Sequence, residues 1–346
     1  MYLTNIQCAV ARRECYSCPF PGPQSSRPQW VDDSWLALIS CEKVMPLASM
    51  VQLLAHAQRG GYAVCYCESW NLESVQAVIE AAEELNSPAI VGFNGGFLLH
   101  PSRSKPENLA FYAGMRLAIS QSRVPIAFLL NETDDLPQIA LGLELGFNAV
   151  MVESHRMELK DYQELVKKVV AMAHARNVFV EGQIGALPDG WAGSDGTSGQ
   201  ITDPMLAKAF VDETGVDALS VSIGNVHVLT SGKAPVNMDA LRRIRAQVQV
   251  PLVIHGGTGF PSECAADVIK LGVAKFNFGT ALKQAYLAAV REKLGAYREP
   301  MNPHLFLGMG GAEDLMVAGK EAVKQKVKEL IQQYGFAGKS PRTLQS

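Results

Sequence analysis

Two histidines stand at the ends of short apolar segments in the second half of the chain. His227 follows the segment 217–222 (DALSVS), and His255 is the last residue of the segment 250–255 (VPLVIH). If both segments are strands of one sheet, the two imidazoles lie close together. Imidazole nitrogens bind zinc, manganese and iron, and they transfer protons near neutral pH. The placement of this pair therefore predicts a metal or acid–base centre.

Carboxylate and amide side chains end several other apolar segments and could complete this centre. Carboxylates are common partners of histidine in metal sites, and they also act as general acids and bases. Several of them lie in NETDD, which follows the segment 124–130. The strand-end groups are Glu68, Asn94, Asn131, Glu132, Asp134, Asp135, Glu153, Glu181 and Gln183. Together they favour a chemical centre over two isolated structural histidines.

Eight short apolar segments alternate with helical patterns and would position these groups. The segments are almost continuously apolar, as expected for parallel strands that are buried on both faces. They lie at 62–67, 88–93, 124–130, 147–152, 178–182, 217–222, 250–255 and 273–277. Helices are predicted at 71–85, 158–177, 203–214, 261–271 and 280–295, with a final one at 313–334. The alternation predicts an α/β fold, a (β/α)8 TIM barrel with an extra C-terminal helix.

An irregular extension is predicted before the barrel. Residues 1–45 include the proline-rich stretch CPFPGPQSSRPQW, so they form no regular element, and the barrel with its C-terminal helical segment is assigned to 46–346. Cys15 and Cys18 have the spacing of half a zinc knuckle, which Cys8 or Cys41 could complete. The irregular spacing favours free thiols on this arm instead.

Glycine-rich loops follow the last two predicted strands. These loops are HGGTG (255–259) and NFGT (277–280), and TSGK (230–233) adds a lysine just after His227. TIM barrels commonly bind phosphate at the loops after strands seven and eight, where backbone N–H groups face the anion. Tight turns alone would also use glycine. The agreement of three loops nevertheless favours a phosphate site.

Composition excludes several other functions. The net charge is −3, and no run of lysine and arginine is present, which argues against nucleic acid as a partner. No segment reaches the roughly 18 apolar residues that a membrane helix needs. The first 30 residues lack the apolar core of a signal peptide, so the expected location is the cytoplasm.

The motifs resemble those of the class II, metal-dependent fructose-bisphosphate and tagatose-bisphosphate aldolases. The resemblance runs from about Met45 to Leu294. It begins with MPLASMVQLLAHAQRGGYAV and NLESVQAVIEAAEELNSPAIV. It continues with TDPMLAKAFVDETGVDALSVSIGNVH, VPLVIHGGTGFP and LGVAKFNFGTAL. It implies a TIM barrel that is a homodimer or higher homo-oligomer.

The resemblance also implies a chemistry and a set of residues. The expected reaction is aldol cleavage of a phosphorylated ketose into dihydroxyacetone phosphate and an aldehyde. A divalent metal stabilises the enediolate; zinc is expected, with manganese or iron as alternatives. The implied metal ligands include His227 and His255. The substrate and phosphate group comprises Asn94, Gly224, Ser231, Lys233, Gly256, Gly257, Thr258, Asn277, Gly279 and Thr280.

The sequence departs from the family at the chemical centre. After strand three the family has Asp-His-Gly, in which Asp transfers the proton and His binds zinc, whereas this chain has Asn131-Glu132-Thr133. After strand five Glu-x-Glu becomes Glu181-Gly182-Gln183. Glu68 replaces the usual Asn of strand one, Gly279 replaces an Asp or Asn of strand eight, and Val228 replaces a Gly.

These departures predict a rebuilt centre. Glu132 would complete a set of two histidines and one carboxylate around the metal. Asn131 cannot transfer a proton as an aspartate does, so Glu68, Asp134 or Asp135 would take that role. The catalytic candidates are thus Asn131, Glu132, Glu68 and Asp134.

Three functions fit this pattern. The favoured one is an aldolase-like lyase on a phosphorylated ketose or triose phosphate, with altered substrate or metal preference. The second is an isomerase or epimerase that acts on a phosphosugar through the same enediolate. The third is a non-catalytic phosphosugar-binding protein. Metal content separates the third from the others, and release of dihydroxyacetone phosphate separates the first from the second.

Overall fold

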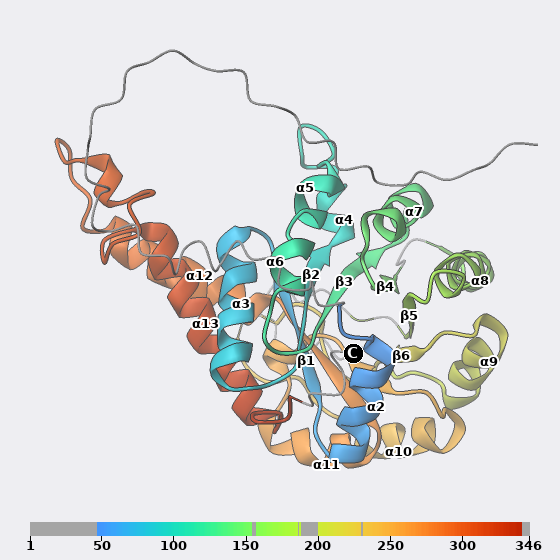
Figure 1. Cartoon of the computed structure of the whole chain (residues 1–346). Coiled ribbons are helices and arrows are strands. Elements are labelled where there is room, and N and C mark those ends of the chain that lie inside the picture. The colour runs from blue at the N-terminus through green and yellow to red at the C-terminus, as the bar shows by residue number, and fades with distance from the viewer. Residues whose placement is uncertain (1–46, 154–156, 186, 188–199, 230, 341–346) are drawn as a thin grey trace, which may run out of the picture. The chain divides into compact units, whose positions relative to one another are not determined.

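Eight parallel strands close into a barrel in chain order, which confirms the predicted TIM barrel (Figure 1). The computed structural model describes residues 47–153, 157–185, 187, 200–229 and 231–340. The strands are β1 Val64–Ser69, β2 Ala89–Asn94, β3 Ile126–Thr133, β4 Ala149–Val152, β5 Phe179–Ile184, β6 Ala218–Val221, β7 Leu252–Ile254 and β8 Val273–Phe278. Parallel pairing of β1 with β8 closes the sheet.

Helices surround these strands and connect them. Those before β5 are α2 Met50–Gly60, α3 Leu72–Glu84, α4 Gly95–Leu98, α5 Leu109–Ala113, α6 Arg116–Ser120, α7 Leu136–Leu145 and α8 Leu159–His174. Those after it are α9 Pro204–Thr214, α10 Met238–Gln247, α11 Ala265–Lys270, α12 Thr280–Leu294 and α13 Leu315–Gln333. Short 3-10 turns lie at Gly257–Gly259, Ser262–Cys264 and Pro303–Leu305. No helix in the described ranges is long and apolar enough to cross a membrane.

Local sequence signals begin and end several of the helices. Asn71 starts α3 with a capping box, in which its side chain accepts from the N–H of Ser74 while the Ser74 hydroxyl accepts from the N–H of Asn71. Asp135 and Asp203 cap α7 and α9 in the same general way, each followed closely by proline. These caps place the ends of the helices, and therefore the strand-to-helix loops that carry the candidate site.

Strand ends differ from the sequence prediction in ways that matter for the site. The segment 124–130 was expected to be the third strand, but β3 continues to Thr133, because Asn131 still pairs with Asn94 of β2. The fifth strand likewise reaches Ile184 rather than residue 182. The seventh strand begins only at Leu252, since Pro251 has no N–H for the ladder. Glu132 and Gln183 consequently lie within β3 and β5 rather than after them.

The predictions for the two ends of the chain and for the helix at 261–271 compare differently with the structure. The predicted helix 313–334 is confirmed as α13, which packs against α12 and α3 (Figure 1). The predicted helix 261–271 is divided into a 3-10 turn and α11. The extension predicted at 1–45, with its four cysteines, lies outside the described residues, which begin at Leu47. All described residues belong to one compact unit, Val44–Ser346.

Candidate metal centre at the carboxyl end of the barrel

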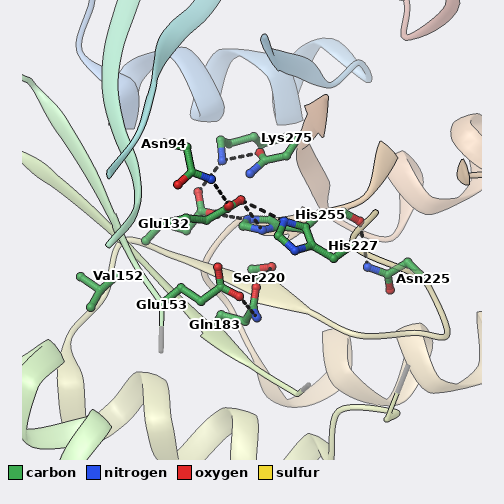
Figure 2. Close-up of polar contacts among 12 residues, drawn as sticks. Asn94, Glu132, Val152, Glu153, Gln183, Ser220, Asn225, His227, His255 and Lys275 are labelled. Carbon is green, nitrogen blue, oxygen red and sulfur yellow. Dashed lines mark hydrogen bonds and ion pairs between the residues drawn. The ribbon is translucent and has the colours of Figure 1, made fainter. Parts of the chain in front are cut away.

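Glu132, His227 and His255 converge at the carboxyl ends of the strands, as Figure 2 shows. One ligand atom from each lies within 4.8 Å of the others. Glu132 Oε1 is 3.3 Å from His227 Nε2 and 3.6 Å from His255 Nδ1. The three come from β3, from the loop after β6 and from the residue that follows β7. The barrel thus brings together the three residues predicted as metal ligands.

The backbone at Glu132 is unusual. Its φ is 52°, in the left-handed region that few residues other than glycine adopt, and the pairing of β3 with β4 changes register between Leu130 and Thr133. A β-bulge of this kind redirects one side chain of a strand. The Glu132 carboxylate is turned toward His227 and His255 in this way, at a cost in backbone energy of about 1–3 kcal/mol.

A second residue holds the Glu132 carboxylate in place. The Asn94 side-chain amide donates to Glu132 Oε2 over 2.5 Å, while its oxygen accepts from the N–H of Phe97 at the start of α4. Both ends of the Asn94 amide are therefore used. Burial raises the pKa of Glu132, but the imidazoles of His227 and His255 more than offset this and hold it well below its usual range. The carboxylate is ionised and available to a cation.

His255 has the hydrogen bonding of a metal-binding histidine. Its side chain is fully buried, and its Nε2 lies 2.9 Å from Glu181 Oε1. A proton on Nε2 satisfies this hydrogen bond and leaves the Nδ1 lone pair directed at Glu132. Nδ1 is buried and has no hydrogen-bond partner. A buried nitrogen of this kind calls for a partner, and a divalent cation shared with Glu132 and His227 fits the donor set.

Lys275 also belongs to this centre, although the sequence did not predict it. It lies on β8, fully buried, and its Nζ donates to Glu181 Oε2 over 2.8 Å and to Asn277 Oδ1 over 2.7 Å. It also lies 5.5 Å from the centre of the Tyr66 ring. The available signal was a lysine within the mainly apolar strand VAKFNF, because a lysine is almost never fully buried without a partner.

The buried pair formed by Lys275 and Glu181 supports His255. Burial raises the pKa of Glu181, but Lys275 and His255 outweigh this and lower it, so its carboxylate stays charged between them. Burial also lowers the pKa of Lys275, although Glu181 opposes the change. The resulting chain runs from Lys275 through Glu181 to His255 and fixes the imidazole ring that faces Glu132.

The predicted acid–base candidates have different surroundings. Asn131 is fully buried, and its side-chain amide lies beside the Glu132 carboxylate, whose pKa it helps to lower. Asp135 accepts from the N–H of Gln138 and thereby caps α7. Asp134 is partly exposed. Glu68 pairs with Lys283, with 2.5 Å between Oε1 and Nζ.

Gly279 makes room for the carboxylate of Glu68. A Cβ at position 279 would lie 2.2 Å from Glu68 Oε2, far closer than two such atoms can approach. The glutamate of β1 therefore fills the space that a side chain on residue 279 would need. The two departures from the family, at Glu68 and Gly279, are thus neighbours in space, and a side chain at residue 279 would require the Glu68 carboxylate to move.

The predicted phosphate residues fall into two groups. The loops after β7 and β8 lie side by side, because the Thr258 hydroxyl accepts from the N–H of Ala281 in the first turn of α12. Asn277 is also there, with a buried side-chain nitrogen that has no partner. Ser231 and Lys233 are exposed, and the Lys233 ammonium binds the carboxylate of Glu263 at 2.7 Å.

The remaining glycines of this group are explained by close packing. A Cβ at Gly224 would lie 2.6 Å from the Pro235 carbonyl oxygen, and one at Gly256 only 1.8 Å from that of Val226. At Gly257 it would meet the Phe278 ring at 2.6 Å. Thr280 opens α12. Gly256 and Gly257 of the HGGTG loop therefore lack side chains because the loop after β6 and the end of β8 pack closely against them.

Replacement of Gly256 by alanine is expected to destabilise the barrel. Gly256 has a φ of +70°, and its new Cβ would clash with backbone, so the free energy of unfolding should fall by about 3 kcal/mol. Gly61→Ala is the matched control, since Gly61 has a φ of +65° but nothing within 4 Å. It should cost only about 1 kcal/mol. Urea unfolding of both variants measures the difference, and equal losses would contradict the packing argument.

Two cavities open beside the centre. One, of about 460 Å³, is lined by Glu68, Asn94, Lys283 and several aromatic side chains. The other, of about 390 Å³, includes Glu153 and Gln183. The Gln183 amide donates to Glu153 Oε1 over 2.9 Å, and its oxygen accepts from the Ser220 hydroxyl. Gln183 is therefore engaged away from Glu132, His227 and His255 (Figure 2).

Comparisons with known proteins agree on one family. The sequence model of the family described as "Fructose-bisphosphate aldolase class-II" matches residues 48–339. A fructose-bisphosphate aldolase of Staphylococcus epidermidis is 30% identical over 302 residues, which is 86% of this chain and all of that protein. The corresponding enzyme of Staphylococcus aureus is 30% identical over 303 residues, again covering 86% of this chain and all of its own length.

Solved structures that resemble this chain are also described as aldolases. The crystal structure of the YdjI aldolase from Escherichia coli K12 superposes with a TM-score of 0.69 at 28% identity, covering 85% of this chain and 100% of that one. A putative fructose-1,6-bisphosphate aldolase from Coccidioides immitis gives a TM-score of 0.70 at 25% identity, over 85% of this chain and 98% of that one.

Proposed function

Because the chain belongs to the class II fructose-bisphosphate aldolase family, we propose that it is a metal-dependent lyase with a rebuilt metal site. It would cleave or form a carbon–carbon bond in a phosphorylated ketose. The observation that carries this proposal is the convergence of Glu132, His227 and His255 within 4.8 Å, with Nδ1 of His255 buried and unpartnered. Zinc is the expected metal, with manganese and iron as alternatives.

The reaction divides into bond cleavage and proton transfer. A divalent cation at this site would polarise the substrate carbonyl and offset the negative charge that develops on its oxygen. In the cleavage direction, the hydroxyl on the fourth carbon gives its proton to a base, and the bond between the third and fourth carbons breaks. The aldehyde half leaves. The electron pair remains on the dihydroxyacetone phosphate half as an enediolate, which then takes up a proton at the third carbon.

We assign the acid–base role to Glu68. Asn131 occupies the family position for this group but has no ionisable proton, and Asp135 is engaged as a helix cap. Burial raises the pKa of Glu68 above its ordinary value, and Lys283 offsets part of that rise. A raised pKa suits a carboxylate that must both take and return a proton near neutral pH. Glu68 also lines the same cavity as Asn94, which holds Glu132.

The phosphate of the substrate is assigned to the loops after β7 and β8. The amide nitrogen of Asn277 and the first turn of the 15-residue helix α12 would supply donors and a positive helix end. Lys233 would have to exchange Glu263 for the phosphate, and this exposed pair contributes little to stability. The Lys233 ammonium can therefore bind the substrate phosphate with little loss of stability.

Assembly into a homodimer or larger homo-oligomer is also proposed. Large apolar side chains are exposed on α12 and the segment after it: Leu287, Leu294, Met301, Leu305, Leu307 and Met309. This concentration of exposed apolar side chains in one part of the chain supports contact with another protein chain. In Figure 1 this region is at the end of α12 and α13 remote from the strands.

The replacement Glu68→Gln tests the proposed chemistry. It should lower kcat by about 10²–10⁴-fold, the usual contribution of general acid–base catalysis, while metal content stays at the wild-type level. The assay is zinc-loaded protein with phosphorylated ketoses, measured as release of dihydroxyacetone phosphate. Interconversion of ketoses without that release would favour an isomerase or epimerase. Full activity in Glu68→Gln would refute the assigned role.

A further inference from the structure

The 460 Å³ cavity beside the proposed metal centre combines aromatic walls with a few charged side chains. Its walls include Trp70, Phe93, Phe97 and Tyr112, and its charged groups are Glu68, Lys283 and Arg103. The cavity adjoins the centre through Asn94, which lines it and hydrogen-bonds Glu132. In the proposed aldol reaction, the dihydroxyacetone phosphate part of the substrate binds at the loops after β7 and β8 and the first turn of α12. This cavity is then available for the aldehyde part.

The cationic side chains of the described cavity wall already have carboxylate partners. Lys283 Nζ is 2.5 Å from Glu68 Oε1, and Arg103 Nη1 is 2.7 Å from Glu107 Oε1. The Nε of Arg103 also donates to the carbonyl oxygen of Phe97. The local charge is therefore close to balanced. A second phosphate would have to displace Glu68 or Glu107 from its cation, and both of these pairs are less exposed than the Lys233–Glu263 pair, so the exchange is less favourable here.

The aromatic side chains supply an apolar surface instead. The Lys283 ammonium lies 4.7 Å from the centre of the Phe97 ring and 5.9 Å from that of Trp70, which fixes its position further. Phe93 and Tyr112 pack edge to face, with ring centres 4.8 Å apart. Phe97 remains 46% exposed although it is large and apolar. A ligand that covers this ring would bury surface that the fold leaves open.

We propose that this cavity binds an uncharged aldehyde, whose carbon chain packs on Phe97 and Trp70, and that the Glu68–Lys283 pair disfavours a phosphorylated one. The proposal rests on the proposed function, because it assigns the second substrate of the same reaction. In this proposal Glu68 and Lys283 determine which aldehyde binds, because each neutralises the charge of the other. Gly279 also contributes to this specificity, since any side chain at this position would displace the Glu68 carboxylate.

The test measures synthesis and binding separately. Zinc-loaded protein receives dihydroxyacetone phosphate together with glyceraldehyde 3-phosphate, glyceraldehyde or butanal. We expect kcat/KM to be at least ten times higher for each uncharged aldehyde than for glyceraldehyde 3-phosphate. Calorimetric titration with each aldehyde should give the same order of affinity. A preference for the phosphorylated aldehyde in both measurements would overturn the proposal.

Two substitutions distinguish charge from packing. Glu68→Gln frees the Lys283 ammonium, so affinity for glyceraldehyde 3-phosphate should rise about tenfold even though turnover falls. Phe97→Ala should raise the KM for butanal about tenfold. Its matched control is Phe111→Ala, a 76% exposed aromatic that does not line the cavity, which should leave that KM unchanged. Unaltered binding in both Glu68→Gln and Phe97→Ala would show that the cavity does not hold the aldehyde.

Failure of this proposal can be told apart from failure of the proposed function. Exchange of a carbon-bound proton of dihydroxyacetone phosphate with D₂O, followed by NMR, needs no aldehyde. Exchange with no discrimination among aldehydes would refute the cavity assignment alone. Absence of exchange would refute the lyase, and the calorimetric order of affinities would still decide whether the cavity prefers uncharged aldehydes.

Discussion

Replacement of Glu132 by alanine is expected to remove the metal from this barrel. Loss of an outer-shell partner commonly weakens metal binding by 10–100-fold, so loss of a direct ligand should weaken it by at least about 100-fold. The two remaining ligands, His227 and His255, would face each other across a site without a carboxylate. Wild-type protein should retain close to one equivalent of zinc after dialysis, and Glu132→Ala should retain almost none. Elemental analysis of both proteins measures this directly.

A second variant tests whether the loss of metal is due to the loss of a metal-binding side chain at residue 132. Glu132→His would put an imidazole, the ligand type usual for the family at this position, on the same β-bulge, whose φ of 52° histidine tolerates better than most residues. It should retain metal. If Glu132→Ala holds as much zinc as the wild type, the rebuilt centre is wrong. Wild-type protein that stays free of metal after incubation with zinc, manganese and iron would favour a phosphosugar-binding protein.

Replacement of Lys275 by methionine is expected to be the most destabilising single change near the site. It leaves the Glu181 carboxylate fully buried, with the imidazole of His255 as its remaining ionisable partner. Removing one partner of a buried ion pair typically costs about 3–5 kcal/mol of unfolding free energy. Denaturant unfolding in the presence of a chelator measures this cost without a contribution from bound metal.

Two further variants identify the cause of that loss. Adding Glu181→Gln to Lys275→Met removes the uncompensated charge, so the double variant should be more stable than Lys275→Met alone. Lys270→Met is the matched surface control, because its partner Asp267 is exposed and the pair should matter by less than about 1 kcal/mol. A double variant less stable than Lys275→Met would contradict the proposed role of the buried charge.

Several parts of the fold were predictable because they depend on local pattern. Strands buried on both faces require apolar residues at almost every position, and helices that cover them require one apolar stripe. The segments 88–93 and 273–277 therefore predicted strands closely, as did 280–295 for a helix. Strand ends were less predictable. The extension of β3 through Asn131 and Glu132 depends on pairing with Asn94 of β2, which no local pattern contains.

The candidate site divides in the same way. Histidines and carboxylates at strand ends predicted Glu132, His227 and His255 as one group, because parallel strands of a barrel deliver their carboxyl ends to one face. Lys275 was not predicted, since its partner Glu181 lies 94 residues away in the chain. Glu68 was predicted as a catalytic candidate, but the placement of its carboxylate beside Gly279, which follows β8, depends on the tertiary structure.

The sequence alone determined the barrel and the family and predicted that Glu132, His227 and His255 converge, because apolar periodicity, motifs and strand-end residues can be read along the chain. Only the tertiary structure decided how those groups are used. The β-bulge aims Glu132, Asn94 holds it, and the Glu181–Lys275 pair fixes which nitrogen of His255 faces the centre. Each of these depends on side chains from different strands meeting within hydrogen-bond distance, and such distances are set by packing rather than by order along the chain.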